Sequence, residues 1–201
     1  MPVPPLNIRD VNRLVSTQSE FTGAQSRNLS RIFDDLLSRI EANENTAAQT
    51  SGWANYSDTQ YTSGAPFSLS ADTDTVLPNN AGSKIETQLP SDVTSFYSGG
   101  KITGRNGDGI LITLDLIAVP TSANTTYIEF WFDIGGSVGE LYRRIISFPK
   151  GNGVVRPINF TVAGYTLDTW ASNGATTYVR ANGTANLYGM RYVITRTHKA
   201  A

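Results

Sequence analysis

The sequence predicts a mainly β protein in which a short N-terminal helical segment, part of it with coiled-coil spacing, precedes a jelly-roll β-sandwich knob. Three observations lead to this fold class. Apolar residues recur with a period of two after residue 64, Asn-Gly occurs four times, and no helical periodicity interrupts the β pattern there. A period of two indicates half-buried strands, and Asn-Gly supplies the positive φ angles of tight hairpin turns.

The segment 1–50 is predicted to be helical and to serve as an anchor and trimerisation segment. Apolar residues at three- and four-residue steps begin at Ile8, and Gly23 is expected to interrupt this first helix before a second one starts at Ser26 or Asn28. In the second helix, four apolar residues step by four, three and four positions, which is heptad spacing. These residues are Leu29, Phe33, Leu36 and Ile40.

The heptad seam leaves two alternatives open. It covers fewer than two heptads, and a helix bundle of that length is marginal in water by itself. The helix could therefore dock on its own β-domain, or it could bundle with copies of itself. Its position ahead of a β-knob favours the bundle.

Residues 51–63 are predicted to be a connector. The segment is rich in Ala, Thr, Ser, Asn and Gln, and it contains the aromatic residues Trp53, Tyr56 and Tyr61. We expect these rings to pack onto a neighbouring surface.

Residues 64–201 are predicted to form the β-sandwich knob. In its clearest strand, Ile128, Phe130, Phe132 and Ile134 alternate with Tyr127, Glu129, Trp131 and Asp133, and a similar apolar row contains Ile110, Ile112, Leu114 and Leu116. Further strands are expected at 66–70, 73–77, 84–89, 141–148, 154–162, 176–180 and 187–195. About eight to ten strands without an intervening helix are typical of a jelly roll.

The aromatic residues of the outward row predict an interface. Because Tyr127 and Trp131 lie opposite the apolar row, that outer face is expected to be covered, and a second copy of the knob is the natural cover. Tyr127, Trp131 and Trp170 are therefore candidate surface or inter-subunit aromatics. Inter-strand or inter-subunit packing is the preferred role of each, ahead of contact with a sugar.

The charge distribution is uneven although the net charge is only −1. Residues 51–139 contain three bases and nine acids, giving −6, whereas residues 140–201 contain eight bases and two acids, giving +6. A basic third of a chain can indicate nucleic-acid binding. Here the bases are spread along predicted strands, so pairing between strands or subunits is the better interpretation, and no nucleic-acid partner is predicted.

Composition excludes several other classes. The chain contains no cysteine, which rules out disulfides, thiolate zinc sites and cysteine nucleophiles. The N-terminus lacks the basic and apolar regions of a signal peptide. No apolar run approaches the roughly 20 residues that span a bilayer, so membrane insertion is not predicted.

Candidate catalytic and metal-binding residues are weak, and neither an enzyme nor a cofactor is predicted. The sole histidine, His198, lies near the C-terminus, where a Ser-His-Asp triad is not expected. Glu129 and Asp133 share a strand face but are about 13 Å apart along it, too far for a glycosidase pair. Asp115 could approach Glu129 from a neighbouring strand. The loops containing Asp72-x-Asp74 and Asn106-Gly-Asp108 hold oxygen ligands for calcium, but turn residues are the favoured interpretation.

Three stretches of the knob resemble the knob domains of tailed-bacteriophage fibre and head-decoration proteins. They are WANYSDTQYTSGAPF at 53–67, PNN at 78–80 and LYGMRYVITRTHK at 187–199. The resemblance covers about residues 50–201. It implies a trimeric jelly roll related in shape to the tumour-necrosis-factor fold, anchored to a particle by an N-terminal segment. It implies no catalytic residue.

Two functions follow from this resemblance. The first is a structural virion protein, a homotrimeric head fibre or capsid-decoration protein whose N-terminal segment binds other capsid or tail proteins. It would be located in the virion and assembled in the host cytoplasm. The alternative is a tail-fibre knob that recognises a host surface glycan or protein. The short helical segment favours the first.

Overall fold

The computed structural model describes residues 23–148 and 152–200. Contacts divide the chain into two units, Met1–Ala48 and Gln49–Ala201.

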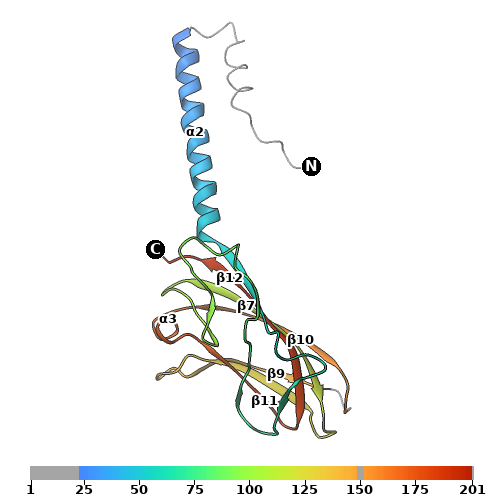
Figure 1. Ribbon diagram of the computed structural model, residues 1–201. Coiled ribbons are helices and arrows are strands. Elements are labelled where there is room, and N and C mark those ends of the chain that lie inside the picture. The colour runs from blue at the N-terminus through green and yellow to red at the C-terminus, as the bar shows by residue number, and fades with distance from the viewer. Residues whose placement is uncertain (1–22, 149–151, 201) are drawn as a thin grey trace. The chain divides into compact units, whose positions relative to one another are not determined.

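Helix α2 runs without a break from Gly23 to Thr50 (Figure 1). The expected interruption at Gly23 coincides with the start of this helix, and the helix expected before it lies outside the described residues. Because residues three and four apart share a helix face, the four predicted seam residues lie along one side of α2. Leu29 and Phe33 are half-buried, whereas Leu36 and Ile40 are 44% and 51% exposed. Their predicted role in trimerisation stays a prediction.

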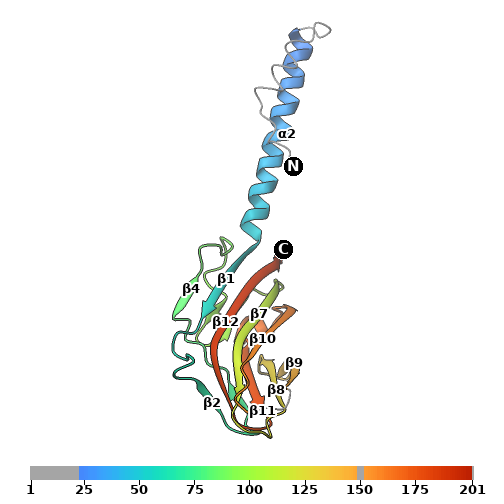
Figure 2. The same ribbon diagram turned by 90° about the vertical axis from the view of Figure 1, so that its right-hand side faces the viewer.

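The described residues of the second unit form a β-sandwich of two antiparallel sheets and a small hairpin. The larger sheet has the strand order β10-β7-β12-β1-β4, with β2 also pairing with β12, and Figure 2 shows its strands side by side. The smaller sheet has the order β3-β11-β8-β9. The strands are β1 (Gly52–Ser57), β2 (Phe67–Leu69), β3 (Thr75–Val76), β4 (Ser83–Ile85), β5 (Tyr97–Ser98), β6 (Lys101–Ile102), β7 (Gly109–Pro120), β8 (Tyr127–Asp133), β9 (Glu140–Ser147), β10 (Arg156–Tyr165), β11 (Thr176–Ala181) and β12 (Ala185–His198).

The connections between the sheets give the sandwich its jelly-roll character. The chain passes from the larger to the smaller sheet between β7 and β8, returns between β9 and β10, passes back between β10 and β11, and returns again between β11 and β12. The strands on either side of these connections therefore face each other across the core, whereas β8 and β9 pair within the smaller sheet. Two sheets connected in this way form the jelly roll that the sequence predicts.

The two predicted inward rows form the centre of the core. Ile128, Phe130 and Phe132 are fully buried, and Ile112 and Leu114 face them from the larger sheet, also fully buried. Alternation along β7 is complete, with each buried residue followed by a half-buried one from Ile110 to Pro120. Because successive side chains of a strand point to opposite faces, the alternation of apolar residues in the sequence matches the alternation of buried and half-buried residues in the sheet.

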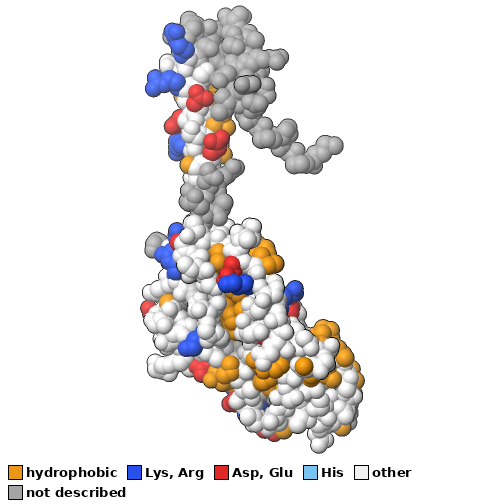
Figure 3. Space-filling model, viewed as in Figure 1, with side chains coloured by type: hydrophobic (Ala, Val, Ile, Leu, Met, Phe, Trp, Pro, Cys, Tyr) orange, Lys and Arg blue, Asp and Glu red, His pale blue; other side chains and the backbone are white. Residues whose placement is uncertain are grey.

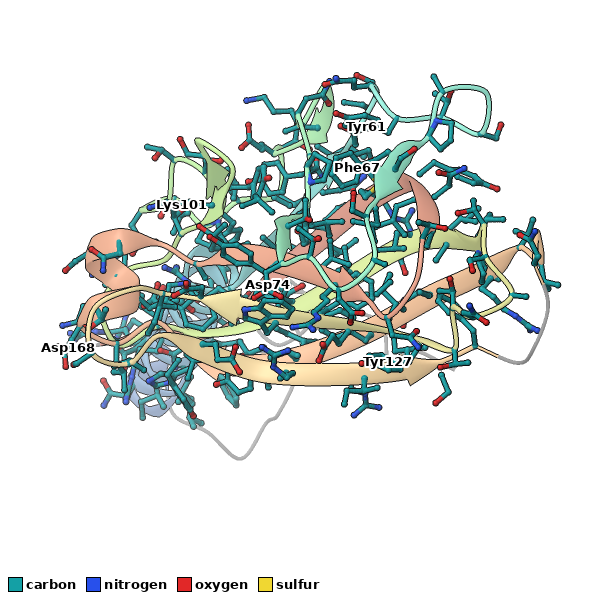
Figure 4. The ribbon with its side chains drawn as sticks, turned by 90° about the horizontal axis from the view of Figure 1, so that it is seen from below. Tyr61, Phe67, Asp74, Lys101, Tyr127 and Asp168 are labelled. Carbon is teal, nitrogen blue, oxygen red and sulfur yellow. The ribbon has the colours of Figure 1, made fainter. Side chains whose placement is uncertain are left out.

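The segment expected to be a connector contains a strand. Residues 52–57 form β1, which lies between β12 and β4 in the larger sheet. Ala54 and Tyr56 are fully buried, whereas Trp53 is 39% exposed. Tyr61 packs edge-on against Phe67 with ring centroids 5.2 Å apart, and Figure 4 shows the two side by side. The connector assignment was wrong for β1. The alternation of a strand is present there, but Ala54 is one of its inward residues and contributes little hydrophobicity, so the pattern is weak in the sequence.

The four Asn-Gly pairs do not form the hairpins expected of them. Asn106-Gly107 connects β6 to β7, whereas Asn152-Gly153 and Asn182-Gly183 connect strands of different sheets. Asn173-Gly174 ends a short helix, α3 (Thr169–Asn173), that the sequence analysis did not predict. Gly174 has φ +70°, as suits a residue that terminates a helix. The β5–β6 hairpin instead turns through Gly99 and Gly100, both with positive φ.

Candidate interaction surfaces

The outer face of the smaller sheet carries a stack of aromatic rings under a guanidinium group. Trp131 on β8 and Tyr178 on β11 are paired in register, and their rings stack at 5.6 Å between centroids and 11° between planes. The guanidinium carbon of Arg143 lies 4.0 Å from the centroid of the Trp131 ring, a cation–π contact. Trp131 is consequently only 4% exposed.

A β-bulge places Arg143 over this ring. Phe130 pairs with Arg144 and Phe132 pairs with Leu141, so Tyr142 and Arg143 together oppose Trp131. Tyr142 has φ +57°, a left-handed conformation that is uncommon for a non-glycine residue. The extra residue shifts the alternation of β9 by one position, so that Arg143 lies on the outer face beside Trp131. Tyr142 packs against the Trp170 ring at 6.5 Å, while Arg143 covers Trp131.

Ion pairs surround this stack, and the exposed apolar side chains of Val76 and Ile145 lie on the same face. Arg143 Nη1 donates to Glu129 Oε2 at 2.7 Å, and the Arg143 guanidinium lowers the pKa of the Glu140 carboxyl below its ordinary value. Arg180 lies 3.2 Å from Asp72 and 3.5 Å from Asp74. A cation therefore already neutralises the Asp72-x-Asp74 loop, which argues against calcium there.

The carboxyl pair considered for glycoside hydrolysis is not assembled. Asp115 lies on β7 in the larger sheet, where it binds Arg191 and Asn159. Glu129 lies on the outer face of the smaller sheet, on the other side of the sandwich, and stacked sheets are about 10 Å apart. These two carboxyls therefore cannot flank one glycosidic bond.

The remaining candidate for catalysis, His198, ends strand β12 and is exposed. Its ring contacts that of Tyr165 at 6.4 Å. Among the described residues, no three His, Cys, Asp or Glu side chains gather closely enough to hold a metal ion. Within 23–148 and 152–200, no helix has the length and hydropathy needed to cross a membrane.

Two of the three predicted surface aromatics are buried within the chain. Trp170, on α3, is 1% exposed, its indole Nε1 donates to the Ile102 carbonyl at 3.1 Å, and its ring packs on Phe132. The prediction that Trp170 is a surface or inter-subunit residue is wrong, because α3 turns the side chain into the core. Trp131 is covered by its own chain instead of a second copy.

The third of these aromatics, Tyr127, keeps a half-buried position at the start of β8. Its backbone N–H donates to Asn182 Oδ1 at 3.1 Å, and Figure 4 places it on the opposite side of the sandwich from Tyr61. Of the three candidate aromatics, it is the one that is not fully covered.

A buried ion network that the sequence analysis missed lies where the chain enters β1 and leaves β12. The side chain of Arg196 is 0% exposed. Its Nη1 donates to Asp108 Oδ2 at 3.1 Å, its Nη2 donates to Asp92 Oδ1 at 2.7 Å, and its Nε donates to the Thr50 carbonyl at 2.6 Å. Asp108 in turn accepts from the backbone N–H of Ala200 at 3.0 Å. Asp108 is thus a partner of Arg196, which argues against calcium at the Asn106-Gly-Asp108 turn.

The Asp92 carboxyl makes stability depend on pH. The hydrogen bond from Arg196 is the largest effect on this group, and it holds the pKa of Asp92 well below its ordinary value. Between that pKa and about 4, where an unfolded Asp titrates, the unfolded chain binds more protons than the folded one. The stabilisation is therefore full above about pH 4 and is lost as the pH falls through the folded pKa.

We expect Asp92→Asn to be less stable than wild type at pH 7 and to lose less stability on acidification. Thermal unfolding between about pH 5 and about pH 2 measures both effects. Asp72→Asn, at a carboxyl whose side chain is 60% exposed, serves as the control and should follow wild type. Parallel pH profiles for Asp92→Asn and wild type would contradict the assignment.

The uneven charge distribution is explained by ion pairs between the two halves of the knob. Bases from 140–201 pair with acids from 51–139 in Arg143–Glu129, Arg180–Asp72, Arg191–Asp115, Arg196–Asp108 and Lys199–Asp92. The positive third of the chain is thereby neutralised within the protein, as the strand-pairing interpretation predicts. In the view of Figure 3, charged side chains on the sandwich are few, and hydrophobic ones lie over its lower half.

Comparisons with known proteins give likenesses of fold only. No known family model and no curated protein matches the sequence. The structure is similar to PRD1 vertex protein P5, with a TM-score of 0.43, 13% identity, and coverage of 75% of this chain and 74% of that one. It is also similar to Eiger TNF from S. frugiperda, with a TM-score of 0.45, 13% identity, and coverage of 76% and 96%. A third likeness is to infectious bursal disease virus Gx strain, with a TM-score of 0.36, 10% identity, and coverage of 74% and 32%.

Proposed function

We propose that this protein is a structural component of a tailed-bacteriophage virion and not an enzyme. In this proposal it forms a homotrimeric head fibre or capsid-decoration protein, anchored to other virion proteins by its N-terminal segment. The resemblance of residues 53–67 and 187–199 to phage knobs motivates the phage assignment. The helical segment supports the assembly role.

The observation that carries the assembly role is an apolar stripe along α2. Ile32, Leu36 and Ile40 follow one another at four-residue steps and are 55%, 44% and 51% exposed. Side chains four apart lie on one helix face, so the three form a continuous stripe. Large apolar residues exposed in a row mark an interaction site. Burying such a stripe is also what stabilises a helix in water, because helix propensity alone contributes little.

The sandwich supports a role without catalysis. The carboxylates considered for chemistry instead hold the structure together: Glu129 binds Arg143, and Asp108 binds Arg196. A stable knob on an amphipathic helix suits a particle component, in which the helix supplies attachment and the knob is displayed.

Light scattering after size-exclusion chromatography tests the trimer. We expect a mass about three times the 21.8 kDa of one chain. Replacing Ile32, Leu36 and Ile40 with Asp should abolish incorporation into particles, because it puts charge on the stripe. A control with Arg31, Asp34 and Arg39 replaced by Ser alters the flanks of the same helix and should be incorporated normally. A clean monomer, or full incorporation of the Asp variant, would refute the proposal.

A glycan array separates this function from that of a receptor-binding knob. Binding of the purified knob to a defined sugar would favour recognition of a host surface. The burial of Trp131 and Trp170 leaves Tyr127 as the one of the three candidate surface aromatics that could contact a sugar. We therefore expect no binding, together with regular occupancy on the particle by microscopy.

A further inference from the structure

The two outer faces of the sandwich differ in charge. The smaller sheet presents Arg143, Arg180, Glu129 and Glu140 with the acidic loop before β3. The outer face of the larger sheet presents one ion pair, Arg191–Asp115, among the outward positions of β10, β7, β12, β1 and β4. Charged side chains are common on a surface that stays exposed to solvent, whereas they are depleted in the core of a protein interface.

A continuous row of uncharged side chains crosses the larger sheet. The strand registers align Thr161, Thr113, Val193, Asn55 and Ile85 from β10 to β4. The hydroxyls of Thr113 and Thr161 hydrogen-bond to each other at 3.0 Å. The next row holds Ala163, Leu111, Thr195 and Trp53 in the same way. Most side chains in these two rows are β-branched or aromatic.

The size of this face matches what a stable association needs. The five strands β10, β7, β12, β1 and β4 contain 10, 12, 14, 6 and 3 residues, and each residue covers about 3.3 Å along its strand and about 4.8 Å across the sheet. The resulting area of about 700 Å² is close to the roughly 800 Å² per partner of a standard interface. Because this face has almost no net charge, it suits a partner whose contacting surface is also close to neutral.

We propose that the outer face of the larger sheet, centred on Val193, is where a second copy of this chain packs. This inference rests on the assembly in the proposed function and specifies which surface of the knob it uses. Interfaces between identical subunits are more apolar than other interfaces, which fits a face of Thr, Val, Leu, Ile and Trp. The ion-paired face of the smaller sheet then remains in water.

Tryptophan fluorescence tests this proposal directly. The chain contains three tryptophans, and Trp131 and Trp170 are 4% and 1% exposed within one copy, whereas Trp53 is 39% exposed. Quenching by acrylamide therefore reports on Trp53. In the purified full-length oligomer, we expect Trp53 to be protected from acrylamide, so that the quenchable fraction of the tryptophan fluorescence is lost.

A pair of Val→Glu variants supplies the matched control. Val193→Glu should restore the quenchable fraction and lower the mass measured by light scattering, because it buries a charge between copies. Val76→Glu, on the outer face of the smaller sheet at a residue that is 45% exposed, should leave both unchanged. Trp53→Phe in the Val193→Glu background identifies the residue that is quenched. Circular dichroism checks that each variant folds.

The outcomes separate this proposal from the proposed function. An oligomer in which wild-type Trp53 is quenched freely would overturn the interface while the assembly stands. A wild-type monomer would overturn both. The wild-type measurement needs no substitution, so the result does not depend on whether a variant folds.

Discussion

Replacing Arg196 with Ala is expected to lower the free energy of unfolding by about 3–5 kcal/mol, the cost of removing one partner from a buried ion pair. The side chain of Arg196 is 0% exposed and that of Asp108 is 1% exposed. Without the guanidinium, Asp108 would keep a buried charge with only the Ala200 N–H as a donor. The Thr50 carbonyl and Asp92 would each lose a donor as well.

Unfolding the full-length protein with increasing urea, at the same protein concentration for each variant, measures the change in the free energy of unfolding. Arg180→Ala is the control, because Arg180 is also an arginine on a strand and also binds two carboxylates, but its side chain is 35% exposed. Ion pairs in contact with solvent contribute about 0–1 kcal/mol, so the control should remain close to wild type. If Arg196→Ala and Arg180→Ala lowered the free energy of unfolding equally, the buried ion pairs of Arg196 would stabilise the protein no more than the exposed pairs of Arg180.

The Arg196 network shows what sequence reasoning can miss and how it could have been found. Along β12, Tyr192 and Ile194 are fully buried, and the period of two places Arg196 on the same inward side. A charged residue in the inward phase of a long strand predicts a buried partner. The sequence does not identify that partner, because Asp92 and Asp108 are 104 and 88 residues away.

Long strands were predictable, and the connections between them were not. Alternation over ten or more residues, as in β7, identifies a strand because only a pleated chain gives every second side chain the same environment. Asn-Gly reports a local need for positive φ, and it carries no information about which sheet the next strand joins. Asn182-Gly183 is an example, since it connects β11 and β12 in different sheets.

The interaction surfaces were predictable only in part for the same reason. The sequence shows that Trp131 lies opposite the inward row of β8, but only the fold shows that the bulge at Tyr142 covers it with Arg143. Likewise, the uncharged row through Val193 draws one residue from each of five strands. No window of the sequence contains that row, so it becomes visible only when the registers are known.

The second large effect is expected at Trp170, whose burial in the core contradicts its predicted position on a surface or between subunits. We expect Trp170→Ala to reduce the free energy of unfolding by about 3–5 kcal/mol, the usual cost of truncating a fully buried large aromatic side chain. The ring is 1% exposed and packs on Phe132 and Tyr142, so its removal leaves a cavity beneath the smaller sheet. A residue on the surface or between subunits would not have this effect on a single knob.

Two further variants separate the contributions at this position. Trp170→Phe keeps most of the packing but leaves the Ile102 carbonyl without the indole donor, so it should lie between wild type and Trp170→Ala. Ile145→Ala, at a residue that is 60% exposed on the outer face of the smaller sheet, should change stability by less than about 0.5 kcal/mol. Urea unfolding of the three variants checks this order. If Trp170→Ala were as stable as Ile145→Ala, the side chain would not belong to the core, and its original assignment to a surface would have to be restored.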